Sequence, residues 1–574
     1  MPALALESGS PLETNSHASI PPVGTANEME PTEQTDPAEP REQTEPTEQT
    51  EQTPHTQRLE SGTRQENGYL YDSFPVYNTR RARLGAPNDK PRIAAGGKSG
   101  GARVLAPDLT RGLLMMIMAL DHVSLFLHTW QHGTGRVPEA DGHVITSWNF
   151  TTAYIVRTLT HLCAPGFTFL LGMGVVYLGR SRTNLGWGHA RLARYFAVRC
   201  AVLTIVTGVL GFVVTGGQVY FMNAVLFALA VDYLLAGLLW LAMEKTEASL
   251  ARFLRILITT RKSWLLGSSP EPAAEAADDE SIMQPLLRER PEADASYEAS
   301  VSWGIHNAVL LALSAVTIFW NAWLSDGGGK CKSSVSAAVT SPAHPLLRIW
   351  FWVLEQPGSR VASNFPPMAW LSFAILGILY GRIITARSWT RQAVVLAHVS
   401  AALFFAILFV LTRVLQFGNL STGCLQTPDQ DAHPLRNPYL ASPASFFYIV
   451  KYPPDLAFLA FTMAAILLIQ AGFTAVPPHI AKRMSMLLDF GTSALFFYVA
   501  HMLIVLLLGA VVVALFGHDT GLPGPMNPDD TRGVDNLFGY FGFWALMMLV
   551  MWPACAWYSR FKSTRGADSI WRFF

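Results

Sequence analysis

Ten apolar runs constrain the fold of this chain more than any other feature of its sequence. Each is close to the roughly 20 residues that a helix needs to cross about 30 Å of hydrocarbon. They lie near residues 112–130, 157–179, 196–215, 219–243, 303–324, 367–386, 392–415, 447–474, 486–516 and 538–558. Only 15% of the residues are charged, well below the roughly 25% that is usual in soluble domains. We predict an all-α polytopic membrane protein with about ten transmembrane helices, whose partner is the lipid bilayer and not nucleic acid.

Positive charges predict which loops face the cytosol. Lysine and arginine gather after the second, fourth, sixth, eighth and tenth runs, and a basic block from Arg80 to Arg103 precedes the first. Loops rich in these residues stay cytosolic, so both termini are predicted to be cytosolic. The two Asn-x-Ser/Thr sequons begin at Asn149 and Asn419, in loops that this topology places outside the cytosol. Both asparagines are predicted glycosylation sites.

The chain divides into four parts. Residues 1–104 are first acidic and rich in Pro, Thr and Gln, then basic, and are predicted to be a disordered cytosolic tail. Spans 1–4 occupy 105–244, and spans 5–10 with a short cytosolic tail occupy 301–574. Between them, 245–300 is predicted to be a cytosolic linker insertion. Its stretch 250–258 mixes Arg with aliphatic residues and favours an amphipathic helix on the membrane surface.

The five cysteines are scattered, without the spacing of a metal site, and no metal cofactor is predicted. Cys331 and Cys424 fall in outer loops, where they form either a disulfide or two free thiols.

The first apolar run carries ionisable residues that do not belong in lipid. Asp121 and His122 lie near its centre, and His128 follows two helical turns after Asp121. On a helix Asp121 and His128 share nearly one face, with His122 beside them. An ionisable group at this depth costs at least a few kcal/mol unless it is paired or faces a polar cavity. The pattern indicates either a hydrogen-bonded pair that locks helix packing or a site for chemistry or proton movement, and we favour the site.

Further polar residues recur at membrane depth or at the outer mouth. His161 precedes a helix-breaking Pro165-Gly166, and His501 lies inside the ninth run. The eighth run opens with Lys451, Tyr452 and Asp455. The predicted topology places all of these with Asp121 and His122 in the outer half or near the midplane, which predicts one shared polar cavity. Some of these residues have a plainer interpretation. His501 could be a packed, hydrogen-bonded histidine, and Lys451 an anchor that snorkels to the membrane surface. His132 and His143, in the first outer loop, could simply be exposed to solvent.

Six short motifs resemble those of a known family. They are Arg111-Gly112 with Asp121-His122 and His128, Thr160-His161 through Phe167 with Gly172, Pro366 through Trp370 with Gly377 and Gly381-Arg382, Lys451-Tyr452-Pro453-Pro454, Leu495 through His501, and Trp557 through Lys562. In this order they resemble the bacterial DUF1624 proteins. These are grouped with the catalytic domain of heparan-alpha-glucosaminide N-acetyltransferase in a transmembrane acyltransferase superfamily. The resemblance spans about 105–574. His122 stands where the heparan branch has a catalytic Asn, and His161 stands where it has an Asp.

The resemblance implies an enzyme that moves an acetyl or other acyl group from cytosolic acyl-CoA to a hydroxyl or amine, such as one on a glycan, on the far side. As a hypothesis, His122, oriented by Asp121, is the general base, and His161, His128 or His501 assists. Lys451 stabilises the oxyanion or binds an acidic acceptor. The other candidates for substrate binding are Arg111, Tyr452, Asp455 and Trp370. Arg382 and the basic inner face are expected to bind acetyl-CoA.

Two other functions fit the same residues. The intramembrane Asp-His pair suits a proton-coupled transporter or flippase equally well, and an inactive scaffold would tolerate its replacement. The sequons and the acidic tail suggest a eukaryotic endomembrane, such as a vacuole or lysosome-like organelle, or the plasma membrane. Self-association into a homo-oligomer is left open.

Overall fold

The computed structural model describes residues 104–131, 139–223, 225–265, 292–325, 328–331, 349–351, 360–521, 530–566 and 569–572. In this part of the chain, ten helical segments are long and apolar enough to cross a membrane. Each coincides with one of the ten predicted runs, so the helical class and the number of candidate spans are confirmed. The predicted tail up to residue 103, the linker from 266 to 291 and His132 lie outside the described residues.

The ten candidate spans follow one another along the chain. They are α1 (Ala106–Phe126), α2 (Thr151–Thr160) with α3 (Cys163–Asn184), α4 (His189–Val214), α5 (Leu226–Leu265), α6 (Glu292–Leu324), α8 (Pro367–Ala386), α9 (Arg391–Val414), α12 (Leu456–Ala475), α15 (Ala494–Phe516) and α16 (Leu537–Ser563). The second span breaks at His161 and Leu162. Pro165 therefore lies in the first turn of α3, where its missing N–H removes no intrahelical hydrogen bond.

Several predicted boundaries were wrong for local reasons. The fourth span begins seven residues later than position 219 because β1 (Phe221–Asn223) pairs in parallel with β2 (Val361–Ser363). The eighth begins at Leu456, after the short helix α11 (Pro443–Phe447), and not at 447. The ninth run divides into α14 (Ser485–Thr492) and α15.

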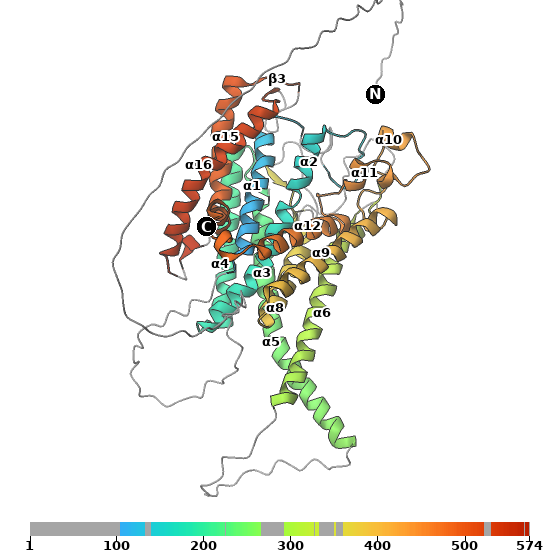
Figure 1. The fold of residues 1–574 in the computed structure, drawn as a ribbon, viewed down its shortest axis with the longest axis vertical. Coiled ribbons are helices and arrows are strands. Elements are labelled where there is room, and N and C mark those ends of the chain that lie inside the picture. Colours follow the sequence, from blue (N-terminus) through green and yellow to red (C-terminus); the bar gives the residue numbers. More distant parts are fainter. Residues whose placement is uncertain are drawn as a thin grey trace, which may run out of the picture. The chain divides into compact units, whose positions relative to one another are not determined.

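The proposed linker boundary at residue 245 falls inside a helix. Helix α5 continues without a break to Leu265, so the predicted surface helix at 250–258 is an extension of the fourth span. In Figure 1, α5 and α6 both run on beyond the end of α8.

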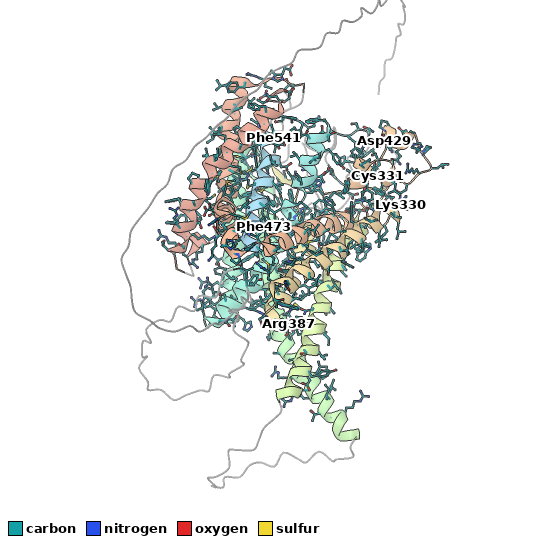
Figure 2. The ribbon with its side chains drawn as sticks, in the orientation of Figure 1. Lys330, Cys331, Arg387, Asp429, Phe473 and Phe541 are labelled. Atoms are coloured by element: carbon teal, nitrogen blue, oxygen red, sulfur yellow. A yellow bond between two sulfur atoms is a disulfide. The ribbon has the colours of Figure 1, made fainter. Side chains whose placement is uncertain are left out.

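The two ends of the helix bundle differ in the residues that they carry: basic side chains at one end and a disulfide at the other. Successive spans alternate in direction, so α1 begins on the side where α3, α8 and α16 end. We call this the basic side, because Arg182, Arg387 and Lys562 lie at those helix ends. On the other, the disulfide side, Cys331 is bonded to Cys424, which settles the cysteine alternatives in favour of the disulfide. Figure 2 labels Arg387 and Cys331 at these opposite ends.

Short elements complete the loops. They are α10 (Pro428–Asp431), the 3-10 helix η1 (Pro438–Leu440), α13 (Pro478–Ala481), the antiparallel pair β3 (His518–Asp519) and β4 (Arg532–Gly533), and the 3-10 helix η2 (Ile570–Arg572).

Helix α1 lies at the centre of the main hydrophobic core. It contacts α2, α3, α12, α14, α15 and α16, and Figure 1 shows it between α15 and α2. Next to it, α3 and α8 cross at very short range: a Cβ on Gly172 would overlap the Ala374 carbonyl, and one on Gly377 would overlap the Phe169 carbonyl. Such small residues let membrane helices approach closely. The crossing holds α3 in place, and with it His161, which lies two residues before the helix begins at Cys163.

Candidate active site

Two histidines from distant spans meet beside the core. His122 Nδ1 of α1 lies 2.7 Å from His501 Nε2 of α15, and the rings stack with centroids 5.0 Å apart. His501 is fully buried, and its Nδ1 lies 2.8 Å from the Phe497 carbonyl oxygen. The sequence predicted that Asp121 would orient His122. The hydrogen-bond partner that orients this imidazole is His501 Nε2 instead.

Asp121 belongs to a neighbouring charge network. Its Oδ1 lies 3.5 Å from Arg157 Nη1 and accepts a hydrogen bond of 3.4 Å from Thr160. Arg157 also forms an ion pair with Glu139, with 3.3 Å between Arg157 Nε and Glu139 Oε2. The same carboxylate oxygen of Glu139 is bonded to His161 Nε2. A buried network therefore joins α1, α2, the loop before α2 and the break before α3.

Glu139 is the acid of this network that lies outside the spans. Burial raises the pKa of its carboxyl, but the electrostatic influence of neighbouring His161 and Arg157 outweighs burial. The net pKa is lowered from its ordinary value of 4.5. Glu139 is therefore ionised at neutral pH and accepts the hydrogen bond from His161.

The segment before α12 closes the same region. The Lys451 backbone N–H donates to the Glu139 carbonyl at 3.1 Å, and the buried Lys451 ammonium lies 5.2 Å from the centre of the Tyr452 ring. Arg157 lies 5.9 Å from the centre of that ring. The structure thus brings together some of the polar residues that were predicted to share one cavity. We call them the polar cluster, and its members are Asp121, His122, His161, His501, Lys451 and Tyr452.

Trp370 lies on the apolar border of this cluster. It is buried and packs against Phe365 and Phe458, with ring centroids 5.2 and 5.7 Å apart. Phe458 in turn packs on His161 at 5.6 Å. Trp370 therefore supports the cluster through this aromatic layer.

Other predicted site residues have structural partners instead. Asp455 caps α12, accepting hydrogen bonds from the Phe458 and Leu420 backbone N–H groups at 2.7 and 3.0 Å. Arg382 is buried, and its guanidinium donates to Glu247 at 2.6 Å and to Asn307 at 2.9 Å. A guanidinium held in this way has little left to offer a phosphate, so its predicted role in CoA binding is not supported.

His128 does not share a helix face with Asp121. Helix α1 ends at Phe126, and His128 adopts a positive φ of 50° with Nδ1 2.8 Å from the Arg532 carbonyl oxygen. It connects α1 to β4 on the disulfide side and lies apart from the His122 pair.

The two sequon asparagines differ in accessibility. Asn149 is half-buried and donates to the Gln131 carbonyl at 2.9 Å. Asn419 is buried; its Nδ2 donates to the Thr412 carbonyl at 3.0 Å and its Oδ1 accepts from Arg413 at 2.8 Å. A glycan on Nδ2 of Asn419 would require this packing to open, so the fold argues against glycosylation there.

A cavity of about 540 Å³ lies between α1, α3, α4, α5, α15 and α16. Its cationic lining residues are Arg111, Arg182, Arg199, Lys562 and Arg572. No carboxylate is among the described lining residues. The volume is in the range of small-molecule and cofactor sites, roughly 300–1,000 Å³.

The cavity runs from the basic side towards the histidine pair. Arg182 and Lys562 lie at helix ends on that side, whereas Met115 and Tyr498 line the deeper part. The Tyr498 ring lies edge-on to both histidines, 6.4 Å from the His122 ring centre and 5.8 Å from that of His501. Tyr498 is therefore the shared wall between the cavity and the pair.

Sequence reasoning missed Glu139, Tyr498 and Arg572 as site residues, and assigned Arg157 no role. Only Arg157 gave a signal, because it is an arginine at the start of an apolar run, where a buried charge needs a partner. In the described residues no group of three or more His, Cys, Asp or Glu side chains is placed to hold a metal ion.

Comparison with known proteins adds no family. No model of a protein family matches the chain, and no curated protein matches it. The class that fold and site define is a chain of ten candidate membrane spans around an internal polar cluster.

Proposed function

We propose that this chain is a transmembrane acyltransferase. Acyl-CoA enters the cavity from the basic side, and its acyl group passes to a hydroxyl or amine acceptor, such as one on a glycan, that reaches the polar cluster from the disulfide side. The observation that carries this proposal is the cavity, which has cations at its mouth and a histidine pair behind its inner wall.

The charge of the mouth suits CoA, a polyanion. Arg182 Nε is buried without a hydrogen-bond partner among the described residues, although its guanidinium lies 5.1 Å from the Trp187 ring centre. A buried donor without a partner costs about 1–3 kcal/mol, and a phosphate oxygen would satisfy it. The apolar residues deeper in the cavity, among them Met115 and Phe167, suit the pantetheine and acyl chain.

The chemistry belongs to His122. It takes the proton from the acceptor as the acceptor oxygen or nitrogen bonds to the thioester carbonyl carbon. The C–S bond then breaks, and CoA leaves as the free thiol with that proton. Lys451, a member of the cluster, is the proposed source of the positive charge that stabilises the carbonyl oxygen. The six family-like motifs of the sequence point to the same reaction.

The positive-inside rule makes the basic side cytosolic, with both termini on that side. CoA is a cytosolic compound, which agrees with this orientation. The acceptor then lies in an organelle lumen or outside the cell, and an endomembrane such as that of a vacuole or lysosome-like organelle is the proposed location.

A proton-coupled transporter is the second candidate. The observation in its favour is the run of ionisable side chains at span depth, from His501 and His122 through Asp121 and Arg157 to His161. A transporter has no need for a cavity that selects CoA, so ligand binding separates the two functions.

The test is thermal stability of the purified full chain with acetyl-CoA, CoA or ATP. We expect stabilisation by both CoA ligands that exceeds the effect of ATP and is weakened by Arg182→Gln. Arg387→Gln is the matched control, because Arg387 is an exposed arginine on the same side and outside the cavity. Equal shifts with ATP, or none with any ligand in folded protein, would contradict the acyltransferase and favour the transporter.

A further inference from the structure

The hydrogen bonds of the histidine pair have a defined donor-to-acceptor direction, and a backbone carbonyl sets it. The Phe497 carbonyl oxygen, 2.8 Å from His501 Nδ1, can only accept a hydrogen bond. His501 Nδ1 must therefore carry the hydrogen. In a neutral imidazole the other nitrogen, Nε2, then holds a lone pair.

The lone pair of His501 fixes the hydrogen of His122. With 2.7 Å between His122 Nδ1 and His501 Nε2, one nitrogen must donate and the other accept. Since His501 Nε2 is the acceptor, His122 Nδ1 is the donor. The lone pair of His122 is thereby placed on Nε2, which no described residue bonds.

The opposite arrangement requires a charged His501 with a hydrogen on each nitrogen. His501 is fully buried, between the rings of Phe497 and His122, and no carboxylate is bonded to it in the described part of the chain. A charge there would be taken out of water without a counter-ion, which is strongly unfavourable. The neutral, directed pair is the arrangement that this environment stabilises.

We propose that His501 is a positioning residue, which holds His122 in the single tautomer whose Nε2 can accept the acceptor's proton. This inference rests on the proposed acyltransferase function. Neither histidine is among the residues that line the cavity, and His501 acts through its hydrogen bond with His122. Without His501, the Nδ1 hydrogen of His122 loses its acceptor, and the ring can rotate and take up either tautomer.

Three substitutions of His501 separate this role from packing. In His501→Gln the amide oxygen can reach the position of Nε2 and accept from His122. In His501→Asn the shorter amide reaches only the position of Nδ1, and His501→Leu has no acceptor at all. Release of CoA from acetyl-CoA, with water as the acceptor, is followed with a thiol reagent.

We expect the Asn and Leu variants to lose about 100-fold in kcat, the size of a typical general-base contribution, with KM for acetyl-CoA unchanged. The Gln variant should recover most of this loss. Equal kcat in wild type and the Leu variant, or wild-type protein that binds acetyl-CoA and never releases CoA, overturns the assignment.

A measurement without turnover tests the tautomer itself. Nitrogen NMR of ¹⁵N-histidine-labelled protein distinguishes protonated from unprotonated ring nitrogens, and the signals lost in His122→Asn identify His122. We expect a protonated Nδ1 in wild type and in His501→Gln, and a mixture in His501→Leu. A protonated Nε2 in wild type refutes the positioning role. If instead Nδ1 is protonated but acetyl-CoA does not bind, the proposed function fails, and the catalytic role of the pair fails with it.

Discussion

Two histidines of this protein, His122 and His161, each have a hydrogen-bond partner inside the fold, but the two partners and their surroundings differ. His122 pairs with a neutral histidine, is half-buried, and lies behind the Tyr498 wall of the cavity. His161 pairs with the ionised Glu139, is almost fully buried, and packs against Phe458. A neutral, directed pair beside a cavity suits proton transfer, whereas an ionised carboxylate held between His161 and Arg157 suits holding the loop to the spans.

Substitutions in the two pairs should therefore have different effects on stability and on turnover. Removing one partner of a buried ion pair leaves the other charge uncompensated, which costs about 3–5 kcal/mol. Removing one partner of a neutral hydrogen bond costs about 1–3 kcal/mol. Stability should thus depend mostly on Glu139, and turnover mostly on His122.

Replacement of Glu139 by Ala should give the largest loss of stability. Arg157 and His161 lose the carboxylate that they share, so we expect a decrease in unfolding free energy of about 3–5 kcal/mol. Thermal unfolding of the purified protein measures it. Glu244→Ala, which removes a half-exposed acid near Arg382, is the control and should have a much smaller effect. Equal effects of the two substitutions would contradict a central role for Glu139.

Replacement of His122 by Ala should abolish CoA release and leave the fold intact. We expect a loss of about 100-fold or more in kcat. The loss of stability should be about 1–3 kcal/mol, that of one neutral hydrogen bond, and smaller than that of Glu139→Ala. Such a result would separate this pair from the Glu139–His161 pair. Turnover at the wild-type rate would remove His122 from the mechanism.

Replacement of His161 by Asn should show the reverse pattern. The hydrogen bond to a charged carboxylate is lost, and we expect about 1.5–3 kcal/mol of destabilisation. CoA release per folded molecule should stay within a few-fold of wild type. A loss as large as that of His122→Ala, in folded protein, would make His161 a second proton-transfer residue and break the comparison.

The pH dependence of stability should report Glu139. Because its pKa is lowered by folding, its contribution to stability is present above the ordinary value of 4.5 and is lost as the pH falls through the lower, folded value. The stability difference between wild type and Glu139→Gln should therefore shrink below about pH 4.5. A difference that stays constant down to pH 3 would mean that folding does not lower the pKa of the Glu139 carboxyl.

The sequence predicted the span count and most of the cluster, for physical reasons. Apolar length and charge asymmetry are local properties, so all ten spans could be located. An ionisable residue in an apolar run is visible in the sequence itself. For this reason the sequence identified Asp121, His122, His161 and His501. Their partners could not, because pairing depends on how helices pack: His501 is separated from His122 by 379 residues.

The predictions that the structure disfavours have the same origin. Arg382 resembles a CoA ligand in sequence, but Glu247, 135 residues away, neutralises it. His128 fits a helical face only if α1 continues, and it ends at Phe126. Asn419 fits a sequon, but Arg413 and the Thr412 carbonyl enclose its amide.

The most direct test of the central claim is thiol release from acetyl-CoA by the purified full chain and by its His122→Ala variant. Both must first be shown to be folded and to bind acetyl-CoA more tightly than ATP. The account predicts slow release of CoA by the wild type, which His122→Ala reduces about 100-fold without loss of binding. Equal release by both proteins, or none by a wild type that binds acetyl-CoA, would contradict it.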